Sequence, residues 1–322
     1  MTLIQSLLLC AVLLQFCIPV SSCNAARTFK TYWNMPTIQC ERYKLGFEKL
    51  GQKHNILQNK RDAFAGDQIT ILYHPGLYPQ IGSNEGNLTA HLELLEADIN
   101  KSIPSVDFSG VGIIDFERWR PIYRQNFGTL TKYRTLSTKI EKEKQPSWER
   151  FEKHGRLFME KSLLLAQKIR PKATWGYYGF PHCFNHDMKD RCSALVEGEN
   201  NRTKWLFTAS DMLNPSVYIN KASFTQTQLM NMIKGRVKEA QRLLTTLNDK
   251  KLRTVIPYYA LVDPQTGKLL PEEDIVNSIS TFRELQIDGL IVWGSSASVN
   301  TLEKCRNLYK YIDTVFGPAL NK

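Results

Sequence analysis

Two carboxylates, Asp115 and Glu117, end a short apolar segment that begins at Gly110 and reads GVGIIDFE. The apolar residues predict a buried strand, in which side chains two positions apart project from the same face, about 6.5 Å apart along the backbone. Asp115 and Glu117 therefore point the same way, and their repulsion raises the pKa of one of them. A carboxyl that keeps its proton near neutrality can act as a general acid, while its ionised neighbour stabilises positive charge. This combination suits glycoside hydrolysis through an oxocarbenium-like transition state.

Arginines and aromatic residues near the strand ends leave two further questions open. Arg118, Arg120 and Arg124 follow the carboxylates closely and could hold them in ordinary ion pairs. Aromatic planes pack on the C–H faces of sugars, but they fill hydrophobic cores equally well. The aromatic residues at expected strand ends are Tyr177, Tyr178, Tyr218, Tyr258, Tyr259 and Trp293. A sugar-binding groove and a packed core are both compatible with this pattern.

The strands and helices that would position these residues alternate along the whole chain. Expected strands span residues 30–33, 68–73, 112–116, 174–178, 216–219, 253–258 and 289–293. Expected helices span residues 88–101, 148–168, 227–247, 272–285 and 301–315. Alternation of this kind predicts a parallel sheet covered by helices. About seven units without an evident linker favour a single α/β barrel of the TIM type, whose active site lies at the C-terminal ends of the strands.

The N-terminus has the composition of a targeting segment. Residues 1–25 contain no charged side chain, and an apolar stretch from Leu3 to Val20 leads into small residues. We interpret residues 1–25 as a secretory signal peptide and residues 26–322 as one catalytic barrel. A membrane anchor is the alternative for this segment. In a secreted chain, Asn-X-Ser/Thr sequons become candidates for glycosylation, and they occur at Asn87, Asn100 and Asn201.

Cysteine usage agrees with secretion. Cleavage after Ala25 would leave four cysteines, an even number that suggests two disulfides in an oxidising compartment. Cys183 and Cys192 are close enough to close one loop, and Cys40 and Cys305 would then tie the two ends of the chain together.

The formal net charge of +11 favours a negatively charged partner, such as nucleic acid, a membrane surface or an acidic polysaccharide. No basic helix or groove motif supports a nucleic-acid partner.

Several stretches, in order over nearly the whole mature chain, resemble the hyaluronidase family of insect venoms and animal tissues. They are YWNMPTIQC (32–40), LGFEKLGQKHNILQN (45–59), ILYHPGLYP (71–79), GVGIIDFERWRPIYRQNFGTL (110–130), FEKHGRLFMEKSL (151–163), WGYYGFPHCFN (175–185), WLFTASDMLNPSVYIN (205–220), GRVKEAQR (235–242), DGLIVWGSSASVN (288–300) and KCRNLYKYIDTVFGPA (304–319). The set is most similar to the arthropod venom and salivary enzymes.

The resemblance implies a distorted (β/α) barrel with fewer than eight strands. It implies endo-hydrolysis of β-1,4 N-acetylglucosaminyl bonds in hyaluronan, with chondroitin as a slower second substrate. Configuration would be retained by substrate assistance, in which the acetamido carbonyl of the sugar attacks the anomeric carbon. The family further implies a secreted, monomeric enzyme that acts as a spreading factor in venom or saliva. No metal, cofactor, nucleic acid or membrane span is implied.

The resemblance also assigns roles to residues at matching positions. Glu117 would be the acid and then the base, and Asp115 would orient and charge the acetamido group. Tyr178 and Tyr218 would bind that group, and Trp293 would wall the pocket. Further substrate contacts would come from Arg120, Arg236, Tyr73, Ser295 and Ser296, with the two arginines near substrate carboxylates. The implied disulfides are Cys40–Cys305 and Cys183–Cys192.

The chain departs from the family pattern at several places. His74 stands where Tyr-Asp-Pro-Gly is usual, so that an acidic groove residue is lost. The segments 80–84 and 146–151 are shorter than in relatives. These changes keep open a catalytically silent hyaluronan-binding protein of the same fold, and a glycosidase that prefers chondroitin or chitin-like chains. The intact carboxylate pair favours an active enzyme.

Overall fold

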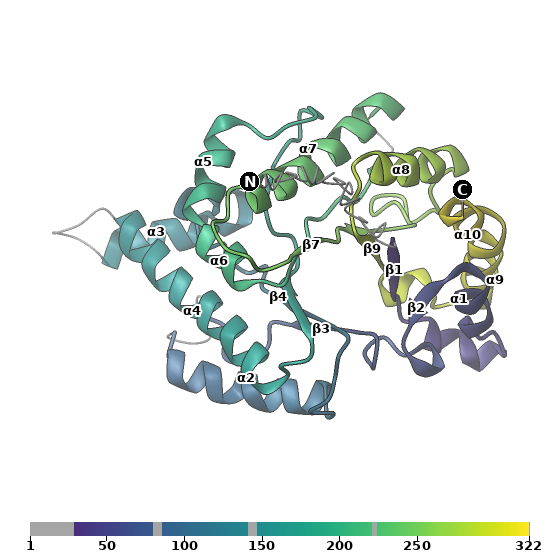
Figure 1. The fold of residues 1–322 in the computed structure, drawn as a ribbon, viewed down its shortest axis with the longest axis horizontal. Helices are drawn as coiled ribbons and strands as arrows, with labels where there is room; N and C mark the ends of the chain where they lie inside the picture. Colours follow the sequence, from purple (N-terminus) through teal and green to yellow (C-terminus); the bar gives the residue numbers. More distant parts are fainter. Residues whose placement is uncertain (1–28, 80–85, 141–146, 221–223, 322) are drawn as a thin grey trace, which may run out of the picture.

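Parallel strands form the centre of the molecule, and helices surround them (Figure 1). The computed structural model describes residues 29–79, 86–140, 147–220 and 224–321. The expected signal peptide, residues 1–25, and the shortened segment 80–84 lie outside these ranges. No helix in the described ranges has both the length and the apolar character that crossing a membrane requires.

The strands form three parallel sheets, in the orders β2-β1-β9-β8, β3-β4-β5 and β6-β7. Their bounds are β1 Lys30–Asn34, β2 Ile56–Gln58, β3 Ile69–Tyr73, β4 Val111–Asp115, β5 Thr174–Tyr177, β6 Met212–Leu213, β7 Thr254–Val255, β8 Tyr258–Tyr259 and β9 Gly289–Trp293. Single parallel bridges, Tyr178 to Asn214 and Ser216 to Tyr258, continue the pairing from one sheet to the next. β1 lies beside β3, and no ladder joins these two strands in the described part of the chain.

Alternation along β4 separates the barrel interior from the helix-facing layer. Val111 and Ile113 point inward and pack with Tyr258 and other inward residues of the neighbouring strands. Ile114 and Phe116 point outward into the core beneath the helices. Because side chains alternate with a period of two, Asp115 falls on the inward face, at the C-terminal end of its strand.

The helices cover the outside of the strands. Their bounds are α1 Glu48–His54, α2 Leu88–Ser102, α3 Thr131–Ile140, α4 Ser147–Ile169, α5 Ala194–Arg202, α6 Lys204–Ala209, α7 Gln226–Thr245, α8 Glu272–Glu284, α9 Leu302–Tyr311 and α10 Gly317–Leu320. Asn87 caps α2 by accepting a hydrogen bond from the Ala90 amide, and Thr225 opens α7 with a capping box. Such caps satisfy amides that have no partner in the first helical turn. The five long helices expected from periodicity are all present.

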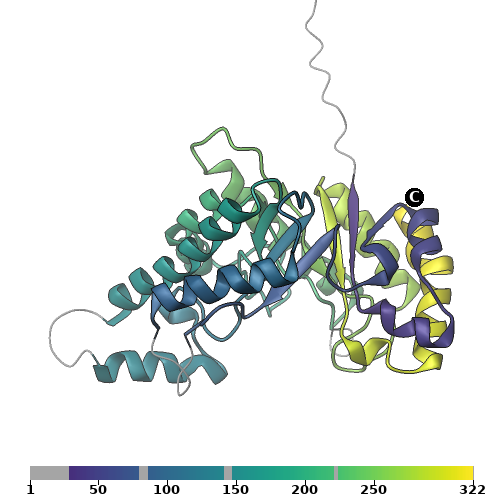
Figure 2. The same cartoon turned by 90° about the horizontal axis from the view of Figure 1, so that it is seen from below.

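Two disulfides pair the cysteines as expected. Cys40 bonds to Cys305 with a Cα–Cα distance of 5.7 Å, and Cys183 bonds to Cys192 at 5.1 Å. The first bond joins the turn after β1 to α9. Figure 2 shows β1 beside β9 and α1 against the C-terminal helices, and the contacts of β1 with β9 and of α1 with α10 agree with this view.

Two expected strands differ in the structure, and a proline lies directly before one of them and inside the other. The strand expected at residues 216–219 is reduced to one bridge at Ser216, and the regular pairing lies earlier, in β6. The strand expected at 253–258 is divided into β7 and β8. Pro215 and Pro257 have no amide hydrogen to donate to a ladder. The elements β2, α1, α5, α6 and α10 were not expected, because so few residues carry too little periodicity. The helix α3 was not expected either.

Candidate active site

The strand β4 delivers Asp115 to the mouth of the barrel, and Glu117 follows two residues later. Asp115 pairs in register with Tyr73, the last residue of β3. Phe116 turns to the opposite face, where its ring stacks on Tyr78 with centroids 3.9 Å apart. This buried contact anchors the backbone between the two carboxylates and supports the expected geometry of the pair.

Tyr73, Tyr178 and Tyr258 lie close enough to the buried Asp115 carboxylate for its charge to raise their pKa values. Asp115 is only 3% exposed. Its Oδ1 atom and the Tyr258 hydroxyl are both buried without a hydrogen-bond partner among the described residues. Burial, and secondarily the nearby carboxylates, raise the pKa of Tyr73 and of Tyr178 to about 12. Unsatisfied buried polar atoms are costly, so these oxygens mark a site built for a polar ligand.

The two carboxyl groups compete for one proton. Burial, and then the charge of Glu117, raise the pKa of Asp115 to about 8. Loss of hydration also raises the pKa of Glu117, although the positive charge of Arg120 works against this. Near neutrality the pair therefore favours a state in which Asp115 keeps its proton. Because Asp115 is the more deeply buried, it is the favoured site of that proton in the unliganded protein.

Two of the three arginines that follow the carboxylates have other partners. In the ranges that the structure describes, neither Asp115 nor Glu117 forms an ion pair. Arg124 instead pairs with the buried Glu199, and Arg120 donates from Nη1 to the Gln125 carbonyl at 2.7 Å. The ion-pair interpretation of the motif is therefore wrong for the described structure.

Aromatic side chains from several strand ends form a wall next to the carboxylates. Trp293 donates from Nε1 to the Tyr73 hydroxyl at 2.8 Å, which joins the ends of β9 and β3. Trp293 also stacks on Tyr218, with ring centroids 5.8 Å apart. The ring centroids of Tyr218 and Tyr178 are 6.3 Å apart. Phe64 stacks on Tyr73 at 6.2 Å. Phe64 was missed because it lies between β2 and β3, where no strand pattern points to the site.

A cavity of about 230 Å³ adjoins this wall and contains Glu117. It is lined by Glu117, Arg120, Phe127, Tyr178, Gly179, Pro181, His182, Cys183, Phe184, His186, Ser216 and Arg236. Arg236 comes from α7 and donates to the Asn185 side chain at 3.1 Å and to the Ser216 carbonyl at 2.6 Å. The structure thus brings Arg120 and Arg236 together with the proposed acid. His182 was not among the expected site residues.

Ser295 and Ser296 lie apart from this cavity, on the exposed segment that follows β9. The Ser296 hydroxyl accepts a hydrogen bond from Gln39 at 2.8 Å. These two serines therefore lie at the rim of the barrel mouth, beyond Trp293.

The three sequon asparagines are exposed on helices or at a helix start. Besides capping by Asn87, the side-chain oxygens of Asn100 and Asn201 accept hydrogen bonds from Arg170 and Arg242. Their glycosylation stays a prediction.

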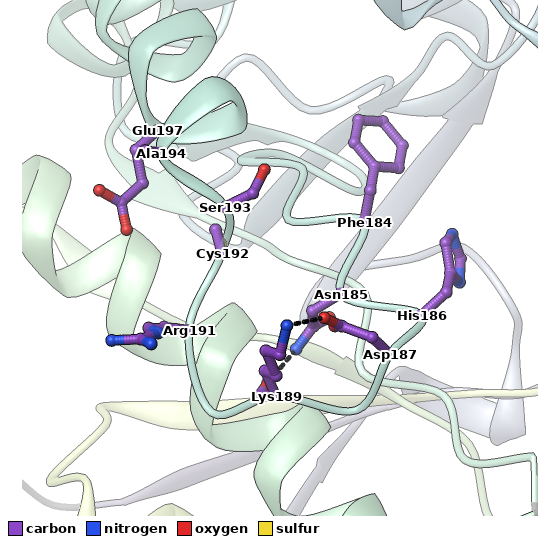
Figure 3. Close-up of a pocket in the computed structure, with 10 residues that line it drawn as sticks. All are labelled: Phe184, Asn185, His186, Asp187, Lys189, Arg191, Cys192, Ser193, Ala194 and Glu197. Atoms are coloured by element: carbon purple, nitrogen blue, oxygen red, sulfur yellow. Dashed lines mark hydrogen bonds and ion pairs between the residues drawn. The ribbon is translucent and has the colours of Figure 1, made fainter.

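A second, larger cavity of about 570 Å³ lies between the Cys183–Cys192 loop and the start of α5 (Figure 3). It shares Phe184 and His186 with the first cavity. Positively and negatively charged side chains both line this cavity. Among them, Lys189 Nζ lies 2.8 Å from Asp187 Oδ2 in an ion pair. Among the described residues, no group of three or more His, Cys, Asp or Glu side chains could hold a metal ion.

Comparisons with known proteins identify the family of this chain. Residues 19–322 match the family described as hyaluronidase, glycoside hydrolase family 56. Hyaluronidase A of Vespula vulgaris is 39% identical over 327 residues, covering 92% of this chain and 97% of the relative. The crystal structure of bee venom hyaluronidase is similar with a TM-score of 0.87 and 37% identity, over 92% of this chain and 100% of that chain. A structure of bee venom hyaluronidase in complex with a hyaluronic acid tetramer gives a TM-score of 0.85 and 36% identity, over 92% of this chain and 99% of that chain.

The resemblance inferred from the motifs is confirmed, and with it the TIM-like α/β barrel. The chain belongs to the hyaluronidase family of glycoside hydrolases.

Proposed function

We propose that this protein hydrolyses the β-1,4 N-acetylglucosaminyl bonds of hyaluronan within the chain, with retention by substrate assistance. The observation that carries this proposal is the position of Asp115 and Glu117 together at the barrel mouth, where burial raises both pKa values and neither carboxyl forms an ion pair within the described ranges. The bee venom relative is known in complex with a hyaluronic acid tetramer. The basic charge of the chain suits a polymer with one carboxylate per disaccharide.

The acetamido group of the substrate would sit among Asp115, Tyr178 and Tyr218, beside the wall formed by Trp293. An amide N–H that donates to Asp115 favours the ionised carboxylate, so that the shared proton passes to Glu117. Glu117 then protonates the linking oxygen as the acetamido carbonyl attacks C1 and the C1–O bond breaks. The same carboxylate next takes a proton from the water that attacks C1 and displaces the acetamido oxygen. Two displacements at C1 retain its configuration.

The Glu117→Gln variant tests the proposal, because it keeps the shape of the side chain but removes the transferable proton. We expect the rate of hyaluronan size reduction to fall by at least about a hundredfold, while hyaluronan binding is kept. Glu96→Gln, at an exposed position on α2, is the matched control and should cut normally. Cleavage by Glu117→Gln at the wild-type rate would show that another group is the acid. A wild-type protein that binds hyaluronan without cutting it would instead be the silent homologue.

We also propose that the protein is secreted as a monomer after removal of residues 1–25, and that chondroitin is a slower substrate. Two disulfides support an oxidising compartment, and relatives of this chain include a venom protein. Size reduction of chondroitin sulfate under the same conditions checks the substrate preference. The N-terminal sequence and the mass of the protein in the culture medium check its processing and its oligomeric state.

A further inference from the structure

We propose that His182 is a third contact, beside Arg120 and Arg236, for a uronate carboxylate next to the cleaved bond, and that it gains a proton when the polymer binds. The inference rests on the proposed function and adds a residue to the recognition of that substrate. The resemblance to the family assigns no role to this position.

The surroundings of His182 hold its ring against the cavity that contains Glu117. The ring stacks on Phe184 with centroids 5.0 Å apart and lies 4.5 Å from the ring of Phe180. The His182 carbonyl accepts a hydrogen bond at 2.8 Å from the side chain of the buried Asn200. The imidazole nitrogens make no hydrogen bond to any described residue. His182 is therefore fixed in place while its nitrogens stay available to a ligand.

The two arginines of the cavity also keep donors for a ligand. Arg120 packs over the rings of Phe127 and Phe184, at 5.2 and 5.1 Å from their centroids. It uses Nη1 for the Gln125 carbonyl, and a guanidinium group has five N–H donors. Arg236 uses Nε and Nη1 for its protein contacts and leaves Nη2 without a partner among the described residues. Glu117 is the sole acidic side chain among the described residues that line the cavity.

The chemistry of hyaluronan supplies the anion for this cavity. Each N-acetylglucosamine in the polymer has a glucuronate on both sides. When N-acetylglucosamine occupies the site beside Asp115, the sugar that enters the adjoining cavity is a glucuronate, whichever way the chain runs. Its carboxylate would meet Arg120, Arg236 and His182, since these supply the donors there.

Electrostatics explain why His182 gains its proton only with the ligand. Burial, and then the charges of Arg120 and Arg236, lower the pKa of His182 to about 3 in the free protein. A bound carboxylate adds a negative charge beside His182 and the two arginines, and so raises that pKa. The other titratable groups in the cavity are Glu117, Tyr178 and His186. Since the pKa is higher in the complex, affinity rises as the pH falls from the pKa of the complex toward that of the free protein.

The experiment compares wild type with His182→Gln on hyaluronan oligosaccharides and on the same oligosaccharides with methyl-esterified carboxyls. We expect the variant to raise KM for hyaluronan about tenfold at pH 5, as for loss of a charge-assisted hydrogen bond, with the loss in KM rather than in kcat. The ester substrate should show a change of less than about twofold, because it has no charge to lose. His154→Gln, at an exposed position on α4, is the matched control and should leave KM unchanged.

Binding measured without turnover separates this inference from the proposed function. In the Glu117→Gln background, calorimetry in two buffers should show fewer protons taken up per bound oligosaccharide when His182 is also replaced by Gln. An equal loss of affinity on both substrates would assign His182 to packing and overturn the inference, as would an unchanged KM and proton uptake. Absence of cleavage by wild type would contradict the proposed function instead.

Discussion

The proton shared by Asp115 and Glu117 is the central feature at the scale of single residues. Asp115 is buried, and its Oδ1 atom has no hydrogen-bond partner among the described residues. Its pKa of about 8 means that ionising it inside the folded protein is unfavourable. The site thus stores free energy that a substrate amide can recover when it donates to the carboxylate, as expected for a preorganised active site.

Stability should therefore depend on the ionisation of Asp115. Between its ordinary pKa of 3.8 and about 8, the unfolded chain releases the proton while the folded protein keeps it, so stability falls as the pH rises. Asp115→Asn removes this loss. We expect it to raise the free energy of unfolding at pH 8 by a few kcal/mol, about 5 at most, since a tenfold change in proton affinity corresponds to about 1.4 kcal/mol.

Urea unfolding of both proteins at pH 4 and at pH 8 measures this difference. Asp107→Asn is the control, because Asp107 is exposed and pairs with Lys172. The control should leave the pH dependence nearly unchanged. A variant Asp115→Asn whose stability tracks that of wild type at both pH values would show that Asp115 is not protonated in the folded protein.

At the scale of elements, the packing of β4 against β5 sets the position of the carboxylates. Gly112 leaves room for the indole of Trp175, and a Cβ atom at position 112 would lie 2.6 Å from that ring. Trp175 is fully buried and donates from Nε1 to the Arg170 carbonyl. The ring is thus held between the strand and the helix layer, and moving it would disturb buried packing and the hydrogen bond to Arg170.

Gly112→Ala should consequently destabilise the protein. We expect a loss of about 1–3 kcal/mol in the free energy of unfolding, the usual cost of overpacking a well-filled core. Gly198→Ala is the matched control, because a Cβ atom at this position of α5 meets nothing within 4 Å. There the change should stabilise the helix by up to about 1 kcal/mol. Denaturant unfolding of the two variants compares them, and equal effects would contradict the packing argument.

At the scale of the whole molecule, the two disulfides act over very different lengths of chain. Cys40–Cys305 spans 265 residues and joins the first strand region to α9, whereas Cys183–Cys192 spans 9 residues beside the active site. A cross-link stabilises mainly by restricting the unfolded chain, and the restriction grows with the length of the closed loop. The long link also holds the first and last elements of the barrel side by side (Figure 2).

Replacing Cys40 and Cys305 by Ala should accordingly cost about 3 kcal/mol more than replacing Cys183 and Cys192 by Ala, on the chain-entropy account. Unfolding of both double variants by urea gives the two losses. The short-loop variant is the control for loss of a buried disulfide. A larger loss for the short loop would show that local strain or contacts outweigh chain entropy here.

Much of the architecture follows from local patterns along the chain. The strands β1, β3, β4, β5 and β9 and the long helices α2, α4, α7, α8 and α9 were all expected, because each carries enough apolar periodicity to identify it. The four-cysteine count led to the observed disulfides. The i, i+2 spacing of Asp115 and Glu117 likewise reflects the geometry of one strand, which needs no information about the rest of the molecule.

Other features depend on contacts between distant segments. Phe64 and His182 joined the site unexpectedly, because only the folded barrel brings the chain before β3 and the disulfide loop to the ends of the strands. The strands expected at residues 216–219 and 253–258 are shorter in the structure, where Pro215 and Pro257 lie at the breaks in the pairing. The protonation of the pair Asp115 and Glu117 depends most strongly on the tertiary structure. Residue types identify two acids, but burial and neighbouring charge choose which one keeps its proton, and both arise from packing across the whole barrel.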